Sequence, residues 1–369
     1  MVISLVQTRS SGSAALHDAG RRADIDTLRA IACIALVSFH VIGSSGSSGL
    51  ELAETHPLRM LNAVLVDVRM PLFSFLSGLV FVVASRGHAD AGWMRRRMLS
   101  KGRRLLVPMV CVGTLFWLTR ALTGQSQEPL WSIFVLPYAH FWYLQATFLI
   151  MAAFILLVWV LDGRDRMAAV ILACGGCAAW LWLPRPPVDL FSLTGALRLS
   201  LFFGAGYLTA RGLPWVRLPD DPSVKRRIGA LTLVLVLVCA AALASGALVL
   251  PAPWRSVAGL CIGLVSCQAL LLIRPVWPAV AWIGQRSYAI YLFHVFFTAG
   301  LRDVALALAP GLDPAIIWPM GMVAGLMGPV LLHEAILHNR IAAHLLLGLP
   351  LRRGAGGQAA RSALVARAT

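Results

Sequence analysis

Charged side chains are scarce in this sequence. Only 13% of its 369 residues are charged, whereas 59% are apolar and the mean hydropathy is +0.77. A water-soluble globule of this size needs more polar material to cover its surface. The composition therefore excludes a soluble protein and predicts an integral membrane protein.

Acidic residues are the scarcest charged group, since 16 Asp and Glu stand against 32 Lys and Arg, which gives a net charge of +16. In a membrane chain the first explanation of this excess is cytoplasmic loop charge, so it does not indicate a nucleic-acid partner. All seven cysteines lie within apolar stretches, which argues against a disulfide framework and against a metal site. We interpret the redox-like spacing of Cys174-Gly-Gly-Cys177 as packing within a span.

The sequence contains no recognisable repeat and no soluble domain, and its apolar segments follow one another with short connections. About 20 apolar residues cross a bilayer as a helix, and shorter segments suffice where a helix is broken or tilted. This rule predicts an all-α integral membrane protein with about ten transmembrane helices in one bundle. The spans are expected near residues 28–43, 66–84, 105–122, 141–161, 167–183, 193–209, 228–250, 254–273, 280–301 and 315–335.

The distribution of basic residues predicts the orientation of these spans. If both termini are cytoplasmic, the inner loops and tails hold 25 Lys and Arg and the outer loops and their edges hold six, with Arg198 inside a span. This is the asymmetry of the positive-inside rule. We expect a multi-pass protein of the cytoplasmic (inner) membrane, with a transmembrane domain over 21–345 and disordered cytoplasmic tails over 1–20 and 346–369.

Ionisable side chains inside a span are costly and are therefore candidates for function. Arg29 and His40 lie eleven residues apart in the first predicted span, which places them on one helix face about 16 Å apart. Asp67, Arg69, Arg198 and His294 are further candidates, although pairing inside the bundle would also explain them.

Five short segments together resemble the acyltransferase 3 family of integral membrane acyltransferases. In chain order, they are Asp26-Thr-Leu-Arg29-Ala-Ile-Ala-Cys-Ile-Ala-Leu-Val-Ser-Phe-His40, Met70-Pro-Leu-Phe-Ser-Phe-Leu-Ser-Gly78, Lys101-Gly-Arg-Arg104-Leu-Leu-Val-Pro108, His140-Phe-Trp-Tyr-Leu144 and Ser287-Tyr-Ala-Ile-Tyr-Leu-Phe-His294. Each is a weak signal alone, but all five occur in the family's order between residue 22 and about 335. The ten expected spans also agree with the family's ten-helix fold.

The resemblance implies transfer of an acyl group, most often acetyl, from cytoplasmic acyl-CoA to a hydroxyl of a cell-envelope or exported carbohydrate or glycolipid. His40 matches the family's catalytic histidine, Arg29 the arginine of its Arg-x10-His motif, and Lys101 with Arg104 its Arg-x-x-Arg pair. Lys101 departs from the usual arginine, which keeps the charge but loses bidentate geometry. Acyl-CoA is then the donor substrate, and no permanently bound cofactor is implied.

The chemistry of the candidate residues fits this reaction. An imidazole with its ordinary pKa near 6.5 can accept the hydroxyl proton as a general base, or it can carry the acyl group itself as a relay. Asp67 is a candidate to orient the His40 ring, although Asp67 could equally pair with Arg69 or Arg198. We expect the donor to lie along the stripe of Cys33, Leu36 and Val37 between Arg29 and His40, with Trp142, Arg198 and His294 as candidate substrate-binding residues.

Two other classes of function remain open from the sequence. A transporter or flippase of a polysaccharide or lipid-linked precursor also has many spans and buried charges, although the corresponding broken helices of many transporters are not found here. A non-catalytic assembly or sensor protein with the same fold is the third class, and the presence of both Arg29 and His40 disfavours it.

Overall fold

The computed structural model describes residues 4–43, 48–81, 89–125, 128–184, 186–212 and 220–351, with the backbone alone for residues 4–22. All regular structure in these ranges is helical. The helices are α1 (Ser4–Ile42), α2 (Pro57–Val64), α3 (Val66–Val80), α4 (Ala91–Leu122), α5 (Ser132–Val135), α6 (Trp142–Val160), α7 (Asp165–Trp182), η1 (Leu190–Ser192), α8 (Leu193–Ala210), α9 (Pro222–Ala244), α10 (Ala252–Ile273), α11 (Pro278–Gly284), α12 (Ser287–Leu308), α13 (Pro314–Leu337) and α14 (Arg340–Leu347).

The expected membrane fold is confirmed. In the described ranges, nine helices are long and apolar enough to cross a bilayer, and α2 with α3, bent by 43°, makes a tenth span if it is counted as one. The span expected at 280–301 differs in detail, because the chain breaks at Gln285 and Arg286 and divides it between α11 and α12. The backbone of α1 is helical from Ser4, through residues expected to form a tail. No proline occurs there to stop it.

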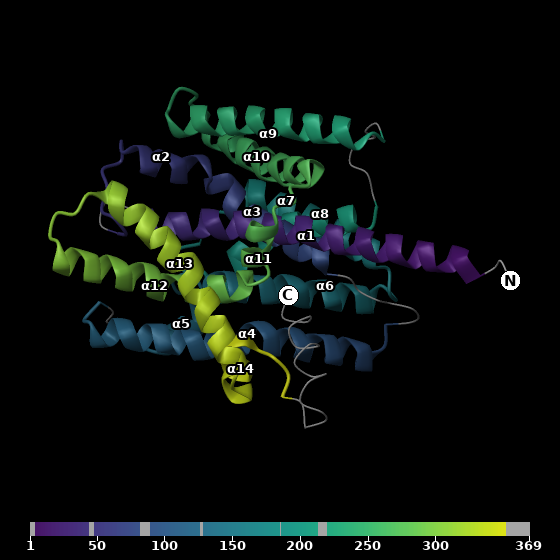
Figure 1. The fold of residues 1–369 in the computed structure, drawn as a ribbon, viewed down its shortest axis with the longest axis horizontal. Coiled ribbons are helices and arrows are strands. Elements are labelled where there is room, and N and C mark those ends of the chain that lie inside the picture. Colours follow the sequence, from purple (N-terminus) through teal and green to yellow (C-terminus); the bar gives the residue numbers. More distant parts are fainter. Residues whose placement is uncertain are drawn as a thin grey trace.

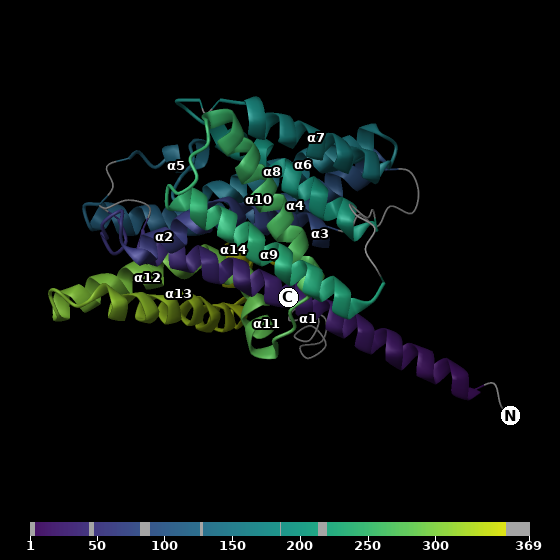
Figure 2. The same ribbon diagram turned by 90° about the horizontal axis from the view of Figure 1, so that it is seen from above.

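Helix α1 crosses the bundle and contacts helices on two sides of it (Figure 1). It packs against α11, α12 and α13 on one side and against α3 on the other. Helices α9 and α10 pack against each other along one edge of the bundle (Figure 1). The paired helices α12 and α13 project together on the opposite side of α1 from α7 and α8 (Figure 2). Any residue of α1 that faces inward is therefore surrounded by several helices.

Two glycines allow α3 and α8 to touch backbone to backbone. A Cβ atom placed on Gly78 would lie 2.0 Å from the Phe203 carbonyl oxygen, and one on Gly206 would lie 2.0 Å from the Phe75 carbonyl oxygen. The contact is reciprocal, since each helix presents a glycine three residues after the phenylalanine whose carbonyl the other glycine meets. Small residues serve the same purpose in many membrane helix pairs.

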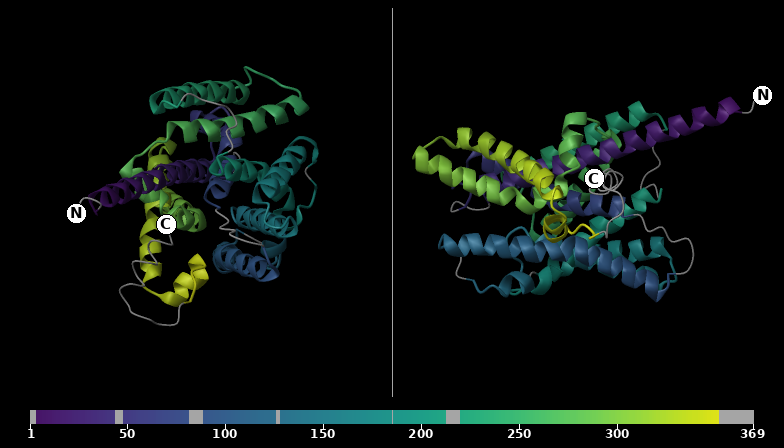
Figure 3. Two further views of the ribbon diagram at one scale, coloured as in Figure 1. Left: turned by 90° about the vertical axis from the view of Figure 1, so that its right-hand side faces the viewer. Right: turned by 60° about the horizontal axis from the view of Figure 1, so that its bottom comes forward.

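The packed chain continues beyond the boundary expected at residue 345. Helix α14 ends at Leu347, which is buried, and it packs against α4 (Figure 3). Gly348 follows with φ at +65°, and a Cβ there would lie 2.5 Å from the Arg103 carbonyl oxygen. The start of the expected C-terminal tail therefore takes part in the fold. Residues 352–369 lie outside the described residues, so the tail itself stays a prediction.

Candidate active site

Three histidines from three separate segments of the chain meet inside the bundle. His40 comes from α1, His140 from the turn before α6, and His294 from α12. The His40 and His294 ring centroids are 4.9 Å apart, those of His140 and His294 5.0 Å, and those of His40 and His140 6.0 Å. We call these three residues the histidine cluster.

Two rings of the cluster are committed to backbone carbonyls. His294, which is fully buried, donates from Nδ1 to the carbonyl oxygens of Ile290 and Tyr291 at 2.8 and 3.0 Å. His140 is 3% exposed and donates from Nε2 to the Leu292 carbonyl oxygen at 3.2 Å. A carbonyl accepts but does not donate, so these bonds fix the neutral tautomers. His294 Nε2 and His140 Nδ1 are left as acceptors without a partner among the described residues.

His40 is the least committed member of the cluster. Its side chain is only half-buried, and its ring makes no hydrogen bond within the described part of the chain. The edge of the Phe39 ring approaches it, at a centroid distance of 5.0 Å. Both ring nitrogens therefore remain available to a substrate, and an imidazole in this state can accept a proton or act as a nucleophile.

Two tyrosines of α12, Tyr291 buried and Tyr288 half-buried, lie between the histidine cluster and the basic end of the bundle. The Tyr291 hydroxyl donates to the His140 carbonyl oxygen, and its ring centroid lies 5.7 Å from that of His140. One turn earlier on α12, Tyr288 donates its hydroxyl to the Arg104 carbonyl oxygen. The Arg104 guanidinium in turn lies over the Tyr288 ring, 4.2 Å from its centroid.

Arg29, Lys101 and Arg104 form one basic cluster. The charge of Arg104 acts on both Arg29 and Lys101, although Arg29 comes from α1 and the other two from α4. Arg29 pairs with Asp26 at 2.8 Å, and Arg104 Nη1 donates to the Leu347 carbonyl oxygen at 2.6 Å. Lys101 lies over the Phe81 ring, 4.5 Å from its centroid. Three cations held together with one nearby carboxylate make a site that favours anions.

The stripe expected to guide the donor is filled by packing, and this expectation was wrong. Cys33 and Val37 are fully buried, and the Cys33 thiol contacts the Ser287 carbonyl oxygen at 3.7 Å. A Cβ atom on Gly325 of α13 would lie 2.6 Å from Val37. Helical periodicity correctly placed these residues on one face, but α12 and α13 cover that face.

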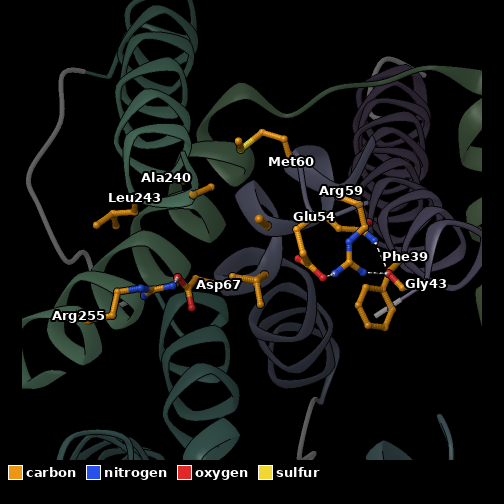
Figure 4. Close-up of a pocket in the computed structure, with 13 residues that line it drawn as sticks. Phe39, Gly43, Glu54, Arg59, Met60, Asp67, Ala240, Leu243 and Arg255 are labelled. Carbon is orange, nitrogen blue, oxygen red and sulfur yellow. Dashed lines mark hydrogen bonds and ion pairs between the residues drawn. The ribbon is translucent and has the colours of Figure 1, made fainter. Parts of the chain in front are cut away.

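Asp67 does not orient His40. Its carboxylate forms an ion pair of 2.7 Å with Arg255 of α10, a partner that the sequence reasoning did not consider. Both residues line a cavity of about 350 Å³ between α1, α2, α3, α9 and α10. In Figure 4 this pair lies on one side of the cavity, and the pair of Glu54 and Arg59 lies on the other.

The cavity reaches Phe39, the residue before His40, and its lining carries no net formal charge. The charged residues of the lining are the two carboxylates and two guanidiniums just described. The hydrogen bond from Arg59 lowers the pKa of the Glu54 carboxyl, which keeps that pair ionised. Asn62 adds an amide that donates to the Gly43 carbonyl oxygen at 3.2 Å.

The remaining candidates lie apart from the histidine cluster. The Trp142 ring packs against Gly195 of α8, where a Cβ atom would lie 2.7 Å from it. Arg198 donates to the Leu183 carbonyl oxygen at 2.5 Å, at the C-terminal end of α7. These contacts give both residues a role in packing, so their substrate-binding role stays an untested prediction.

Sequence reasoning missed one residue of the site, His140. His140 was quoted within a family segment but lies just outside the expected span, so the search for ionisable residues within spans passed over it. Arg69, a candidate at the edge of its span, does not pair with Asp67 and places its guanidinium carbon 3.7 Å from the centroid of the Phe39 ring. A useful signal would have been that His140, like Arg69, lies at the same end of its span as His40.

Comparison with known proteins gives one match. Residues 22–334, nearly the whole chain, match the sequence profile of the acyltransferase domain of the acyltransferase 3 family. No curated protein and no solved structure is detectably similar to the chain. The match covers α1 from before Asp26 to within α13, and so includes every residue of the histidine and basic clusters. The chain therefore belongs to the acyltransferase 3 family and is a multi-pass membrane acyltransferase.

Proposed function

We propose that the protein transfers an acyl group, most simply acetyl, from acyl-CoA to a hydroxyl group of a cell-envelope or exported carbohydrate. In this proposal the basic cluster binds the donor phosphates, His40 activates the acceptor or carries the acyl group, and the cavity beside Phe39 holds the acceptor. The observation that carries it is a half-buried histidine with two uncommitted nitrogens, set between a basic cluster and a neutral polar cavity.

The donor side of the proposal rests on charge. CoA carries several phosphate charges, and guanidinium groups bind phosphate well because of their charge and their fork of donors. We place this end in the cytoplasm, in agreement with the positive-inside count. Tyr288 and Tyr291 lie between this basic cluster and His140, and each donates its hydroxyl to a backbone carbonyl there.

The acceptor side rests on the cavity. A neutral lining with carboxylates, guanidiniums and an amide suits a ligand with many hydroxyl groups and no charge, because each group offers further donors or acceptors. The Phe39 ring and the apolar residues on α9 give such a ligand faces to pack against. A carbohydrate has this combination of hydroxyl groups and apolar C–H faces.

The direct test uses membrane vesicles that contain the protein, radioactive acetyl-CoA and envelope extract from the source cells. The expected result is protein-dependent transfer of label into carbohydrate as an ester that mild alkali removes. CoA release is best followed by chromatography, because exposed free cysteines such as Cys174 and Cys239 would react with thiol reagents. Transport of an unlabelled precursor without thioester cleavage would favour the flippase alternative and contradict the proposal.

The same preparation separates general-base catalysis from a relay. Without acceptor, a relay enzyme accumulates an acyl group on His40, which mass spectrometry of the peptide detects after rapid quenching. Transfer in the absence of such an adduct indicates general-base catalysis. Both outcomes keep His40 at the reaction, and an adduct on another residue would remove it from the relay role.

We expect Arg104→Gln to weaken acyl-CoA binding about tenfold or more, because a charge-assisted hydrogen bond to phosphate is worth roughly 1.5–3 kcal/mol. The measurement is the KM for acetyl-CoA at saturating extract, with the melting temperature as a check because Arg104 also bonds to Leu347. Arg340→Gln is the control, since this exposed arginine begins α14 outside the basic cluster. Equal KM values in both variants would place the donor elsewhere.

Filling the cavity should affect the acceptor and not the donor. Ala63→Trp places a bulky ring on the exposed Ala63 position of the lining. We expect the amount of extract that gives half-maximal transfer to rise about tenfold, with the KM for acetyl-CoA unchanged. Leu61→Trp is the matched control, because Leu61 is exposed on α2 but does not line the cavity. An unchanged extract requirement in Ala63→Trp would exclude this cavity as the acceptor site.

A further inference from the structure

Arg69 is a buried cation beside the histidine cluster, and no described residue neutralises it. Only 7% of the residue is exposed, and its Nη1 atom has no hydrogen-bond partner among the described residues. Its guanidinium lies over the Phe39 ring, and its charge acts on the His40 ring.

The nearest acid in sequence does not compensate this charge. Asp67 is two residues away on α3, which turns its side chain about 200° from that of Arg69. Asp67 faces α10 and pairs with Arg255, whereas Arg69 faces α1. The Phe39 ring face offers a cation–π contact, which offsets only part of the cost of burying a cation.

An unpaired buried cation becomes favourable when negative charge develops within its reach. Acyl transfer creates such a charge, since attack on a thioester turns the carbonyl oxygen into an oxyanion. A donor that is fixed before the reaction and has no competing partner stabilises this state more than the ground state, which is the condition for catalysis.

Resting on the function proposed above, we propose that Arg69 is a catalytic residue that binds the oxyanion of the tetrahedral intermediate. The acceptor hydroxyl oxygen bonds to the thioester carbonyl carbon while His40 takes the hydroxyl proton, and the carbonyl π electrons move to the oxygen that faces Arg69. The intermediate collapses as the carbon–sulfur bond breaks, and the departing thiolate takes the proton from His40. If His40 attacks first, the same carbonyl oxygen becomes negative and Arg69 has the same task.

The test compares Arg69→Leu and Arg69→Lys with the wild-type protein at saturating envelope extract. We expect Arg69→Leu to lower kcat for transfer from acetyl-CoA about a hundredfold, as loss of one oxyanion donor typically does. Arg69→Lys should retain more activity, because it keeps the charge. The KM for acetyl-CoA should not rise and the melting temperature should not fall in either variant. Arg69→Leu removes an unpaired buried charge and Arg69→Lys keeps it, so neither change breaks an ion pair.

Chemical rescue and a control arginine separate catalysis from a structural role. Guanidinium ion at millimolar concentration should raise kcat of Arg69→Ala but not that of the wild type. Arg120→Leu, in which an arginine that bonds the Gln125 carbonyl oxygen is lost, should keep the wild-type kcat. A wild-type kcat in Arg69→Leu would overturn this inference alone. So would a joint loss of kcat and melting temperature in Arg69→Leu if guanidinium ion fails to rescue Arg69→Ala. Absence of transfer by the wild-type protein overturns the proposed function first.

Discussion

His40→Ala is expected to lower the rate of acyl transfer about 10²–10⁴-fold, the usual contribution of a general acid–base group. The loss should appear in kcat at saturating acetyl-CoA and envelope extract. Folding should change little, because His40 is half-buried and its ring makes no hydrogen bond within the described residues. Folded yield and melting temperature in detergent are therefore expected to stay close to those of the wild-type protein.

The matched control is His338→Ala. This exposed histidine follows α13 and bonds to the Glu334 carbonyl oxygen, far in the chain from the histidine cluster. It should keep wild-type turnover. Turnover above about 10% of wild type in His40→Ala would show that His40 is neither base nor relay, since such catalysis is worth at least a hundredfold.

Gly78→Val is expected to prevent stable folding. The first side-chain carbon would meet the Phe203 carbonyl oxygen at 2.0 Å, and backbone at this contact cannot move aside as a flexible side chain can. Separating α3 from α8 would also strain the bond from Ser74 Oγ to the Leu199 carbonyl oxygen, which is 2.9 Å long. We expect the cost to exceed the roughly 1–3 kcal/mol of ordinary overpacking. The measurements are monodisperse yield in size-exclusion chromatography and melting temperature.

A glycine in open space provides the comparison for that change. Gly300 lies within α12, and no atom lies within 4 Å of a Cβ placed there. Gly300→Ala should leave the yield unchanged or raise stability by up to about 1 kcal/mol, because alanine has the higher helix propensity. Wild-type yield and melting temperature in Gly78→Val would show that α3 and α8 do not approach as closely as described.

The sequence predicted the membrane fold and the number of its spans because both depend on composition along the chain. Apolar length identified the helices, and a repeating charge asymmetry supported their count. Arg29, Lys101 and Arg104 lie together in the structure because the entries to α1 and α4 meet at one end of the bundle.

The partners of the buried groups were less predictable, because they come from helices remote in the sequence. Arg255 is 188 residues from Asp67, and no local pattern links them. The face of α1 that carries Cys33 and Val37 follows from helical periodicity, but whether a helix or a substrate covers it depends on where α12 and α13 pack. The position of His140 beside His40 also depends on a remote helix, because His140 bonds to the Leu292 carbonyl oxygen of α12.

The close approach of like charges at Arg29 and Arg104 has a consequence for enzymology in solution. Partly exposed cations attract a polyanion over distances comparable with the Debye length, which shrinks from about 10 Å at 0.1 M salt to about 3 Å at 1 M. The rate of donor capture then depends on ionic strength, whereas the chemical step at the largely buried histidine cluster depends on it much less. Kinetic constants of variants in these two regions are comparable only when buffers of one fixed ionic strength are used.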